Sequence, residues 1–272
     1  MMKIIISHDV DHITVWEHKY DLIVPKFICR SFIEAALRSI SISEIGNRFN
    51  DFLKNKWQNL EEIARFDKEN DVPSTFFIGV NNGVGLSYPP RSAEYWIKII
   101  LNKGFDVGVH GISFADYDDI RSEYEAFKSL SGLQKFGIRM HYLRNAANTV
   151  AALSQAGYMF DSTLYKFENP FKTGNVWEFP LHIMDGHLFY KNSRWQNRTL
   201  EQAKDQTRQT VEKAEKGNIN YLTILFHDRY FCKGFETWKQ WYIWVIGYLR
   251  DNGFKFINYK NAVLELDKQT EV

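Results

Sequence analysis

The stretch Ser7-His8-Asp9-Val10-Asp11-His12 closes the first strand that the sequence predicts. Residues 2–6 before it form a short apolar run rich in β-branched side chains, which is typical of a buried strand. Side chains alternate along a strand, so Asp9 and Asp11 are expected to point to the same side. Burying a charge is costly unless it is paired, protonated or bound to a metal. The motif therefore favours a metal or acid–base site at the end of a strand over two solvated carboxylates in a turn.

Strand-like and helix-like segments alternate along the rest of the chain. The expected later strands are 74–80, 105–110, 136–139, 158–161, 176–181, 221–227 and 254–258, and the expected helices are 52–70, 92–103, 120–130, 146–156, 200–216 and 237–252. This alternation predicts an α/β fold with a parallel sheet and outer helices, closed or nearly closed into a barrel. We expect one domain over residues 1–272, with a helical insertion at about 12–50.

Composition limits the possible partners. The chain has 272 residues and a formal net charge of +1, which gives no field for a polyanion and argues against nucleic acid as a partner. Its two cysteines, Cys29 and Cys232, provide neither a metal-binding spacing nor a disulfide framework.

The sequence also bears on membranes and location. No apolar run reaches the roughly 18 residues of a spanning helix, so no transmembrane segment is expected. The segment 22–40 is either a surface-lying amphipathic stretch, which would allow peripheral membrane association, or an ordinary packed helix. No signal peptide is visible, and we expect a cytoplasmic protein.

Polar residues stand at the ends of several predicted strands. Besides the two aspartates, they are His110, Arg139, His141, Asp161 and His227. A single histidine at a strand end is usually a hydrogen-bonded structural residue. In a parallel sheet, however, all these ends lie at one face, and the side chains can converge on one site.

This ordered set resembles the polysaccharide deacetylases, which are carbohydrate esterase family 4 (CE4) proteins with a NodB homology domain. The resemblance covers roughly residues 3–258 and implies a distorted (β/α) barrel with its site at the C-terminal ends of the strands. Asp9-Val10-Asp11 matches the acidic first motif, which implies Asp9 as the catalytic base and Asp11 as a metal ligand. Ser74-Thr75-Phe76-Phe77 matches a strand of the ATFF type, and His110 matches the first metal histidine.

The later family motifs imply further catalytic residues. Arg139 and Tyr142 match an arginine followed by an aromatic residue, Asp161 matches the fourth motif, and His227 matches the catalytic histidine. The resemblance implies that Tyr142 contributes a backbone N–H to an oxyanion hole. The variant motifs look closer to a WbmS-like subgroup linked with O-antigen biosynthesis.

Three departures from the family pattern affect the metal site. Phe114 stands where the second metal histidine is normal, Val10 separates the two aspartates, and His141 replaces a proline. Phe cannot bind a metal, but His141 follows a strand end on the site face. We therefore predict Asp11, His110 and His141 as the metal triad.

These residue types suit Zn²⁺ in a hydrolytic site with one open position. A bound metal would polarise an amide carbonyl and lower the pKa of bound water, and Asp9 would take the proton. Arg139 is expected to pair with Asp9. His227 would protonate the leaving amine, with Asp161 orienting its imidazole.

The sequence thus predicts a metal-dependent hydrolase that removes an N-acyl group, acetyl or formyl, from an amino sugar in surface-polysaccharide or O-antigen biosynthesis. The substrate would be nucleotide-linked, lipid-linked or an oligosaccharide. One alternative is an inactive carbohydrate-binding homologue, and another is an amide hydrolase acting on a non-sugar substrate.

For the other polar and aromatic residues, the sequence leaves two possible roles open. His8 and His12 either support the metal ligands or belong to a turn. The cluster of His182, Asp185 and His187 either lines the cleft or is structural. Trp177 and Trp195 either stack on a sugar or pack in the core.

Overall fold

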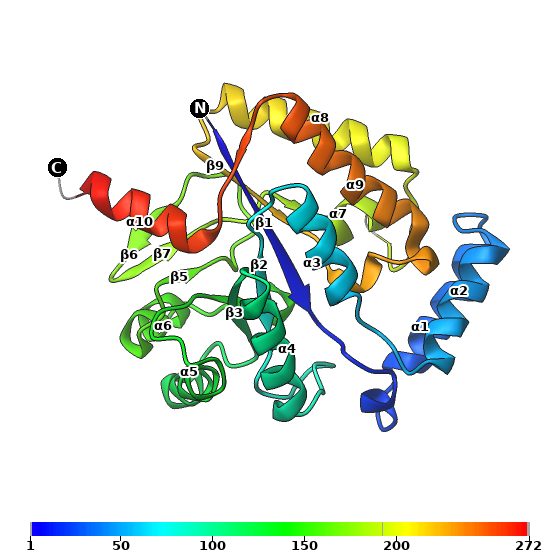
Figure 1. Cartoon of the computed structure of the whole chain (residues 1–272), viewed down its shortest axis with the longest axis horizontal. Coiled ribbons are helices and arrows are strands. Elements are labelled where there is room, and N and C mark those ends of the chain that lie inside the picture. The colour runs from blue at the N-terminus through cyan, green and yellow to red at the C-terminus, as the bar shows by residue number, and fades with distance from the viewer. Residues whose placement is uncertain (1, 192, 271–272) are drawn as a thin grey trace.

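A computed structural model describes residues 2–191 and 193–270. Its centre is one curled sheet in the order β6-β7-β5-β4-β3-β2-β1-β9-β8, and β10 pairs with β1 (Figure 1). The strand pairs are parallel except β6 with β7. The sheet forms a half-barrel with helices outside it, which confirms the predicted α/β fold of the distorted barrel type.

The strands are short apart from the first. They are β1 (Lys3–Val10), β2 (Thr75–Ile78), β3 (Asp106–Gly111), β4 (Ile138–Met140), β5 (Phe160–Asp161), β6 (Phe171–Thr173), β7 (Val176–Glu178), β8 (Ile183–Met184), β9 (Tyr221–Leu225) and β10 (Lys255–Phe256). The helices are α1 (Ile23–Ala36), α2 (Ile42–Leu53), α3 (Leu60–Glu69), α4 (Pro90–Asn102), α5 (Tyr117–Ser131), α6 (Thr149–Ala156), α7 (Asp185–Tyr190), α8 (Leu200–Lys216), α9 (Glu236–Asp251) and α10 (Tyr259–Thr270). Short 3-10 turns follow several strands: η1 (Trp16–His18), η2 (His141–Leu143), η3 (Asp228–Tyr230) and η4 (Lys233–Phe235).

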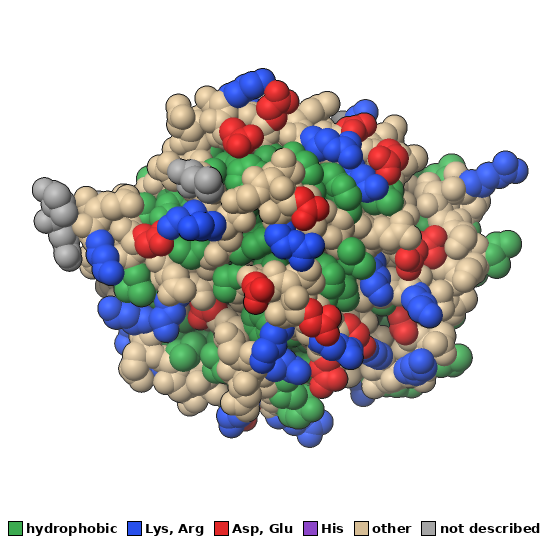
Figure 2. Space-filling view, turned by 45° about the horizontal axis from the view of Figure 1, so that its top comes forward, with side chains coloured by type: hydrophobic (Ala, Val, Ile, Leu, Met, Phe, Trp, Pro, Cys, Tyr) green, Lys and Arg blue, Asp and Glu red, His purple; other side chains and the backbone are tan. Residues whose placement is uncertain are grey.

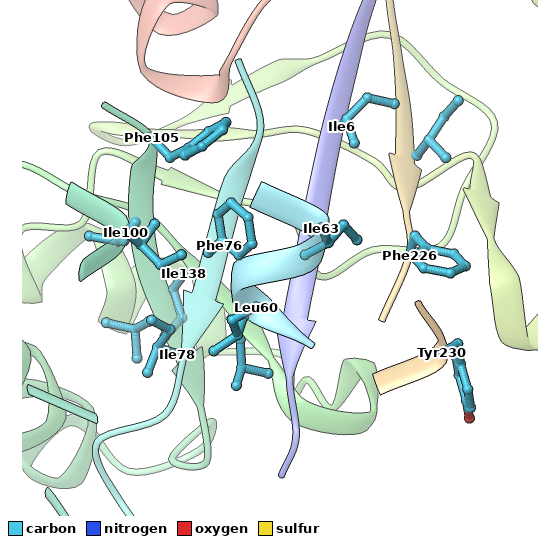
Figure 3. Packing of buried hydrophobic residues seen from close by; sticks show 14 of the residues in the cluster. Ile6, Leu60, Ile63, Phe76, Ile78, Ile100, Phe105, Ile138, Phe226 and Tyr230 are labelled. Atoms are coloured by element: carbon cyan, nitrogen blue, oxygen red, sulfur yellow. The ribbon is translucent and has the colours of Figure 1, made fainter. Parts of the chain in front are cut away.

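Two hydrophobic clusters hold the sheet in place. On its outer face, Ile6, Phe76 and Phe226 pack with Ile63 of α3 in the larger cluster (Figure 3). On the other face, aromatic residues including Phe77, Phe160 and Phe179 pack around Tyr259, the first residue of α10. Because both faces of the central strands are covered, those strands are continuously apolar until they reach the site.

The boundaries differ from the sequence-based expectation in ways that matter for the site. β1 continues four residues beyond Ile6, so Asp9 lies within the strand and Asp11 directly after it. The helix expected at 52–70 is in fact the end of α2 and the whole of α3, separated by a turn in which Asn55 has a φ of 51°. The short strands β6 and β8 were not predicted, since two or three residues carry no periodicity. The helices α7 and α10 were not predicted either.

The chain between β1 and α3 is helical. It comprises η1, α1 and α2, and the last two lie together beyond the end of β1, at the right of Figure 1. Among the described residues, no helix is both long and apolar enough to cross a membrane.

Candidate metal centre and active site

Asp11, His110 and His141 come together at the C-terminal ends of β1, β3 and β4. His110 Nε2 lies 3.2 Å from Asp11 Oδ1 and 3.0 Å from His141 Nδ1, and His141 Nδ1 lies 3.2 Å from Asp11 Oδ1. Ligands around a tetrahedral metal with bonds near 2.0–2.1 Å are separated by roughly 3.4 Å. The three atoms therefore already have the spacing of one face of a metal site.

The other nitrogen of each imidazole explains why these atoms face one another. His110 Nδ1 lies 3.1 Å from the carbonyl oxygen of Arg139, and His141 Nε2 lies 3.2 Å from that of Val84. A carbonyl oxygen accepts a hydrogen bond, so in each neutral ring the remaining nitrogen presents a lone pair. Two lone pairs and a carboxylate converging in this way repel unless a cation lies between them, and these residues therefore fit a divalent metal.

The electrostatics of Asp11 agree with this arrangement. Without a metal, the His110 and His141 nitrogens that face Asp11 can carry a proton in place of the cation. Burial alone would raise the pKa of the Asp11 carboxyl, but hydrogen bonds from these nitrogens hold that pKa well below its usual range. Asp11 is therefore a carboxylate at neutral pH, as a metal ligand must be.

Asp9 is held by Arg139, as expected from the sequence. Arg139 Nη1 donates to Asp9 Oδ1 at 2.9 Å and to Ser7 Oγ at 2.8 Å, while Nη2 donates to Tyr259 at 2.7 Å. The guanidinium is fully buried, and Phe77 lies 4.4 Å beneath it. So many fixed contacts on one planar group lock the carboxylate of Asp9 at the edge of the site.

His227 follows β9 and faces the metal ligands. Its Nε2 lies 3.7 Å from Asp11 Oδ2, and its Nδ1 lies 2.8 Å from Asp185 Oδ1. Burial alone would lower the pKa of His227, but the Asp185 carboxylate, with Asp11 and Asp9 nearby, raises it well above its usual value. The imidazole is therefore charged and available as a proton donor.

Asp161 does not orient His227, which corrects the sequence-based expectation. Its carboxylate accepts a hydrogen bond from Thr163 and lies beside Glu178, its register partner on β7. Burial raises the pKa of Asp161 to about 6 and that of Glu178 well above its usual value. Sequence reasoning placed Asp185 only in a polar cluster with two possible roles, and no motif connected it with His227.

The segment after β4 carries backbone strain. Tyr142 has a φ of 58° and Leu143 a φ of 52°, a left-handed conformation that side chains other than glycine rarely adopt. The cost is on the order of 1–3 kcal/mol per residue, and such strain is usually found where a site requires it. Here the strained turn begins directly after His141 and faces the cavity.

Phe114 lies away from the triad. Its ring is half-buried against the core, and the guanidinium of Arg144 lies 4.9 Å over it. The structure thus brings His141, and not residue 114, to the metal ligands.

The remaining histidines divide into two groups. His8 is buried between Phe226 and Asp67, away from the metal ligands, and His182 bonds Thr223. His187 lines the same cavity as the triad, and so does His12. Of the two tryptophans considered for sugar stacking, Trp195 lines the cavity, whereas Trp177 is buried in the smaller hydrophobic cluster, the one around Tyr259.

His12 belongs to a second group of potential ligands with Glu17 and His18, whose candidate atoms lie within 4.8 Å of one another. Both carboxylates around His18 are already engaged. Glu17 accepts hydrogen bonds from the N–H groups of Ile13 and Thr14, and His18 Nδ1 lies 2.8 Å from Asp21. We interpret this group as a clamp that fixes the start of the helical segment.

A cavity of about 950 Å³ contains the triad, Asp9, Asp185 and His227. Beyond these groups its walls carry aliphatic, aromatic and basic side chains. The aromatic ones include Phe27, Trp57, Tyr190, Trp195 and Tyr230, and the basic ones are Lys26, Arg30, Arg194 and Arg229. Its acidic lining is confined to the three aspartates of the site. One wall belongs to α1.

No family model and no curated protein matches the sequence. Solved structures do match at low identity, so they establish the fold alone. A protein described as a polysaccharide deacetylase from Mycobacterium smegmatis has 16% identity and a TM-score of 0.66, covering 99% of this chain and 91% of its own. PuuE allantoinase has 12% identity and a TM-score of 0.60, covering 96% and 88%. A mutant CE4 pseudoenzyme with restored enzymatic activity has 11% identity and a TM-score of 0.50, covering 96% and 67%. The chain therefore has a CE4 deacetylase-like fold.

Proposed function

We propose that this protein is a metal-dependent hydrolase that removes an acetyl or formyl group from the nitrogen of an amino sugar. The observation that carries the proposal is the convergence of Asp11, His110 and His141 beside Asp9 and His227 in one cavity. The ligand types favour Zn²⁺, which when bound would polarise the amide carbonyl and acidify its bound water.

Two residues of the chain then carry out one proton transfer each. Asp9, paired with Arg139 and fixed by it, takes a proton from the attacking water. His227 gives a proton to the nitrogen of the leaving amine, and Asp185 keeps its imidazole charged and oriented. A base and an acid in the same cavity as the candidate metal ligands are what amide hydrolysis requires.

The strained turn after His141 gives the carbonyl oxygen a place to bind. We assign the backbone N–H of Tyr142 as a hydrogen-bond donor to that oxygen as it gains negative charge. The left-handed conformation at Tyr142 and Leu143 is the cost of aiming the backbone there.

The CE4 deacetylase-like fold favours a sugar substrate, and a role in surface-polysaccharide or O-antigen biosynthesis, in the cytoplasm, follows as part of the proposal. The aromatic walls support this, since rings stack on sugar faces. The carrier is a nucleotide, a lipid or an oligosaccharide.

Two other functions are tested by the same experiment. The first alternative is an inactive carbohydrate-binding protein. One of the similar structures is a mutant of a CE4 pseudoenzyme, but a binding protein needs neither a fixed base nor a charged acid. A non-sugar amide is the second alternative, because one of the similar structures is an allantoinase.

The experiment is to measure metal content by mass spectrometry and then acyl release from N-acetylated and N-formylated amino sugars, with allantoin in parallel. We expect about one metal per chain and release of acetate or formate that stops when the metal is chelated. Sugar binding without metal would support the inactive homologue, and turnover of allantoin alone would support the non-sugar alternative.

A further inference from the structure

Helix α1 is partly inverted: it buries a charged residue and exposes apolar side chains, while Phe27 and the half-buried Ile23 and Val24 still pack against the core. The helix buries Phe27, Ser31 and Glu34. Phe32 within the helix and Leu37, the residue directly after it, are exposed. A helix on the surface of a globular domain normally buries its apolar side and exposes its charges. Leaving a large apolar side chain in water instead of burying it forgoes about 1.5–3 kcal/mol.

Helix α2 repeats the inversion. It buries Glu44 and Arg48 and exposes Ile42 and Leu53, which are 86% and 88% exposed. The buried charges attach the segment to the body of the protein, because Glu34 pairs with both Arg30 and Arg48 at 2.7 Å.

The exposed apolar side chains are concentrated in this part of the chain. Residues 16–54, which we call the docking segment, contain eight of the fifteen large hydrophobic residues exposed in the described chain. Tyr20 and Trp16 are among them, at 90% and 68% exposed. Concentrations of this kind mark interaction surfaces rather than ordinary exposure.

The exposed charges of the docking segment are of one sign. They are Lys19, Lys26, Arg38 and Lys54, while its five acidic residues are all buried or half-buried. Figure 2 shows hydrophobic and basic side chains along the outline at the end of the molecule where α1 and α2 lie in Figure 1. Apolar and cationic side chains together are the pattern of a surface that binds anionic lipid. A second copy of the chain would bring the same cations and be repelled.

Helix α1 also connects this surface to the cavity. Ile33 is exposed and lines the cavity, and Arg30 and Lys26 line it one and two turns earlier. A molecule held at the docking segment would therefore have a direct path to the metal ligands.

Within the cavity, Arg229 has a charge without a counterion. Among the described residues its side chain forms neither an ion pair nor a hydrogen bond, and its Nε is buried without a partner. It lies instead over the rings of Trp57 and Tyr230, at 5.4 and 5.0 Å. An unpaired guanidinium in a cavity wall is suited to a phosphate.

We propose that the docking segment binds an anionic membrane surface and that the cavity receives the phosphate-bearing end of a lipid-linked amino sugar. The membrane binding stands by itself, whereas the choice of a lipid carrier rests on the proposed function. A nucleotide carrier would give no use to an apolar surface outside the cavity.

The first test measures sedimentation with vesicles of phosphatidylcholine alone or mixed with phosphatidylglycerol. The protein should bind the anionic vesicles, and less so in high salt. Changing Leu37→Ser together with Ile42→Ser should weaken this binding at least tenfold. The matched control is Tyr95→Ser with Leu264→Ser, which removes two similarly exposed apolar side chains elsewhere and should change binding less than twofold.

Three outcomes would overturn membrane docking: no binding to anionic vesicles, equal loss in the control pair, or a dimer that the Leu37/Ile42 variant dissociates. Circular dichroism establishes that both variants are folded. Both double variants should hydrolyse a soluble acylated amino-sugar oligosaccharide at the same rate. The vesicle assay therefore tests docking and the hydrolysis assay tests the deacylase function, so either can fail without the other.

The second test uses calorimetry with N-acetylglucosamine 1-phosphate and N-acetylglucosamine, which differ only by the phosphate. The wild type should bind the phosphorylated sugar at least tenfold more tightly, with or without metal, and Arg229→Gln should remove that difference. Lys98→Gln on the outer surface is the control. Equal binding of the two sugars, or a difference that persists in Arg229→Gln, would overturn the phosphate site.

Discussion

Asp185 holds His227 at two points. Its Oδ1 lies 2.8 Å from the imidazole Nδ1, and its Oδ2 accepts a 2.7 Å hydrogen bond from the backbone N–H of the same histidine. The carboxylate is completely buried, so the contact is not weakened by water. One residue therefore fixes both the direction of the ring and its charge.

Replacing Asp185→Asn should lower kcat by about 10²–10⁴-fold, since proton transfer by a positioned acid contributes about that much. KM and metal content should change little. Asp161→Asn is the matched control, because Asp161 bonds Thr163 and not His227, and its kcat should stay within tenfold of the wild type. If Asp161→Asn were the more damaging change, the family-based role of Asp161 would be right after all.

Removing a ligand should remove the metal. His141→Ala should reduce the bound metal from about one per chain to a small fraction, because only two protein ligands remain. His187→Ala, which changes a histidine lining the same cavity outside the triad, should keep its metal. Mass spectrometry of the dialysed proteins measures both, and an unchanged metal content in His141→Ala would exclude it as a ligand.

The role of Asp9 as the catalytic base can be tested separately from the hydrogen bonds that hold Arg139. Asp9→Asn should lose activity by orders of magnitude yet retain metal, since the amide cannot take the proton. Ser7→Ala removes another acceptor of the same Arg139 nitrogen without touching the base. It should cost about 1 kcal/mol of stability and leave most of the turnover. Full activity in Asp9→Asn would assign the base elsewhere.

The buried pair of Asp161 and Glu178 makes stability depend on pH. Both carboxyls have pKa values raised by burial, so the folded state keeps protons that the unfolded chain has released, and stability falls as pH rises above the unfolded values. Glu178→Gln should raise the thermal midpoint at pH 8 and raise it less at pH 5. Glu168→Gln, at a half-exposed surface carboxylate paired with Lys166, should shift the midpoint little at either pH. An equal shift of the Glu178 variant at both pH values would contradict this account.

The convergence of the three candidate metal ligands could be predicted because parallel strands end at one face. Asp11 and His141 directly follow β1 and β4, and His110 lies near the end of β3, so the topology alone brings them together. Asp185 could not be linked to His227 in this way. It begins α7 after the two-residue strand β8, and so short a strand leaves no pattern in the sequence.

The sequence also could not predict that α1 buries a charged residue and exposes apolar side chains. Its apolar composition was visible, and a surface-lying stretch and a packed helix both fitted it. Only tertiary contacts show that Glu34 points inward to two arginines while Phe32 points outward. Periodicity identifies the two sides of a helix but does not say which one faces the protein.

The cavity has two kinds of wall, and they can evolve separately. The ligands and proton carriers sit at the ends of sheet strands, where any shift of the backbone would disturb the whole half-barrel. The wall made by α1 belongs to a connection whose residues contribute nothing to the sheet. Mutations there can alter which molecules enter the cavity without moving the candidate ligands at the strand ends, so the selectivity of the cavity and the geometry of the site can change independently.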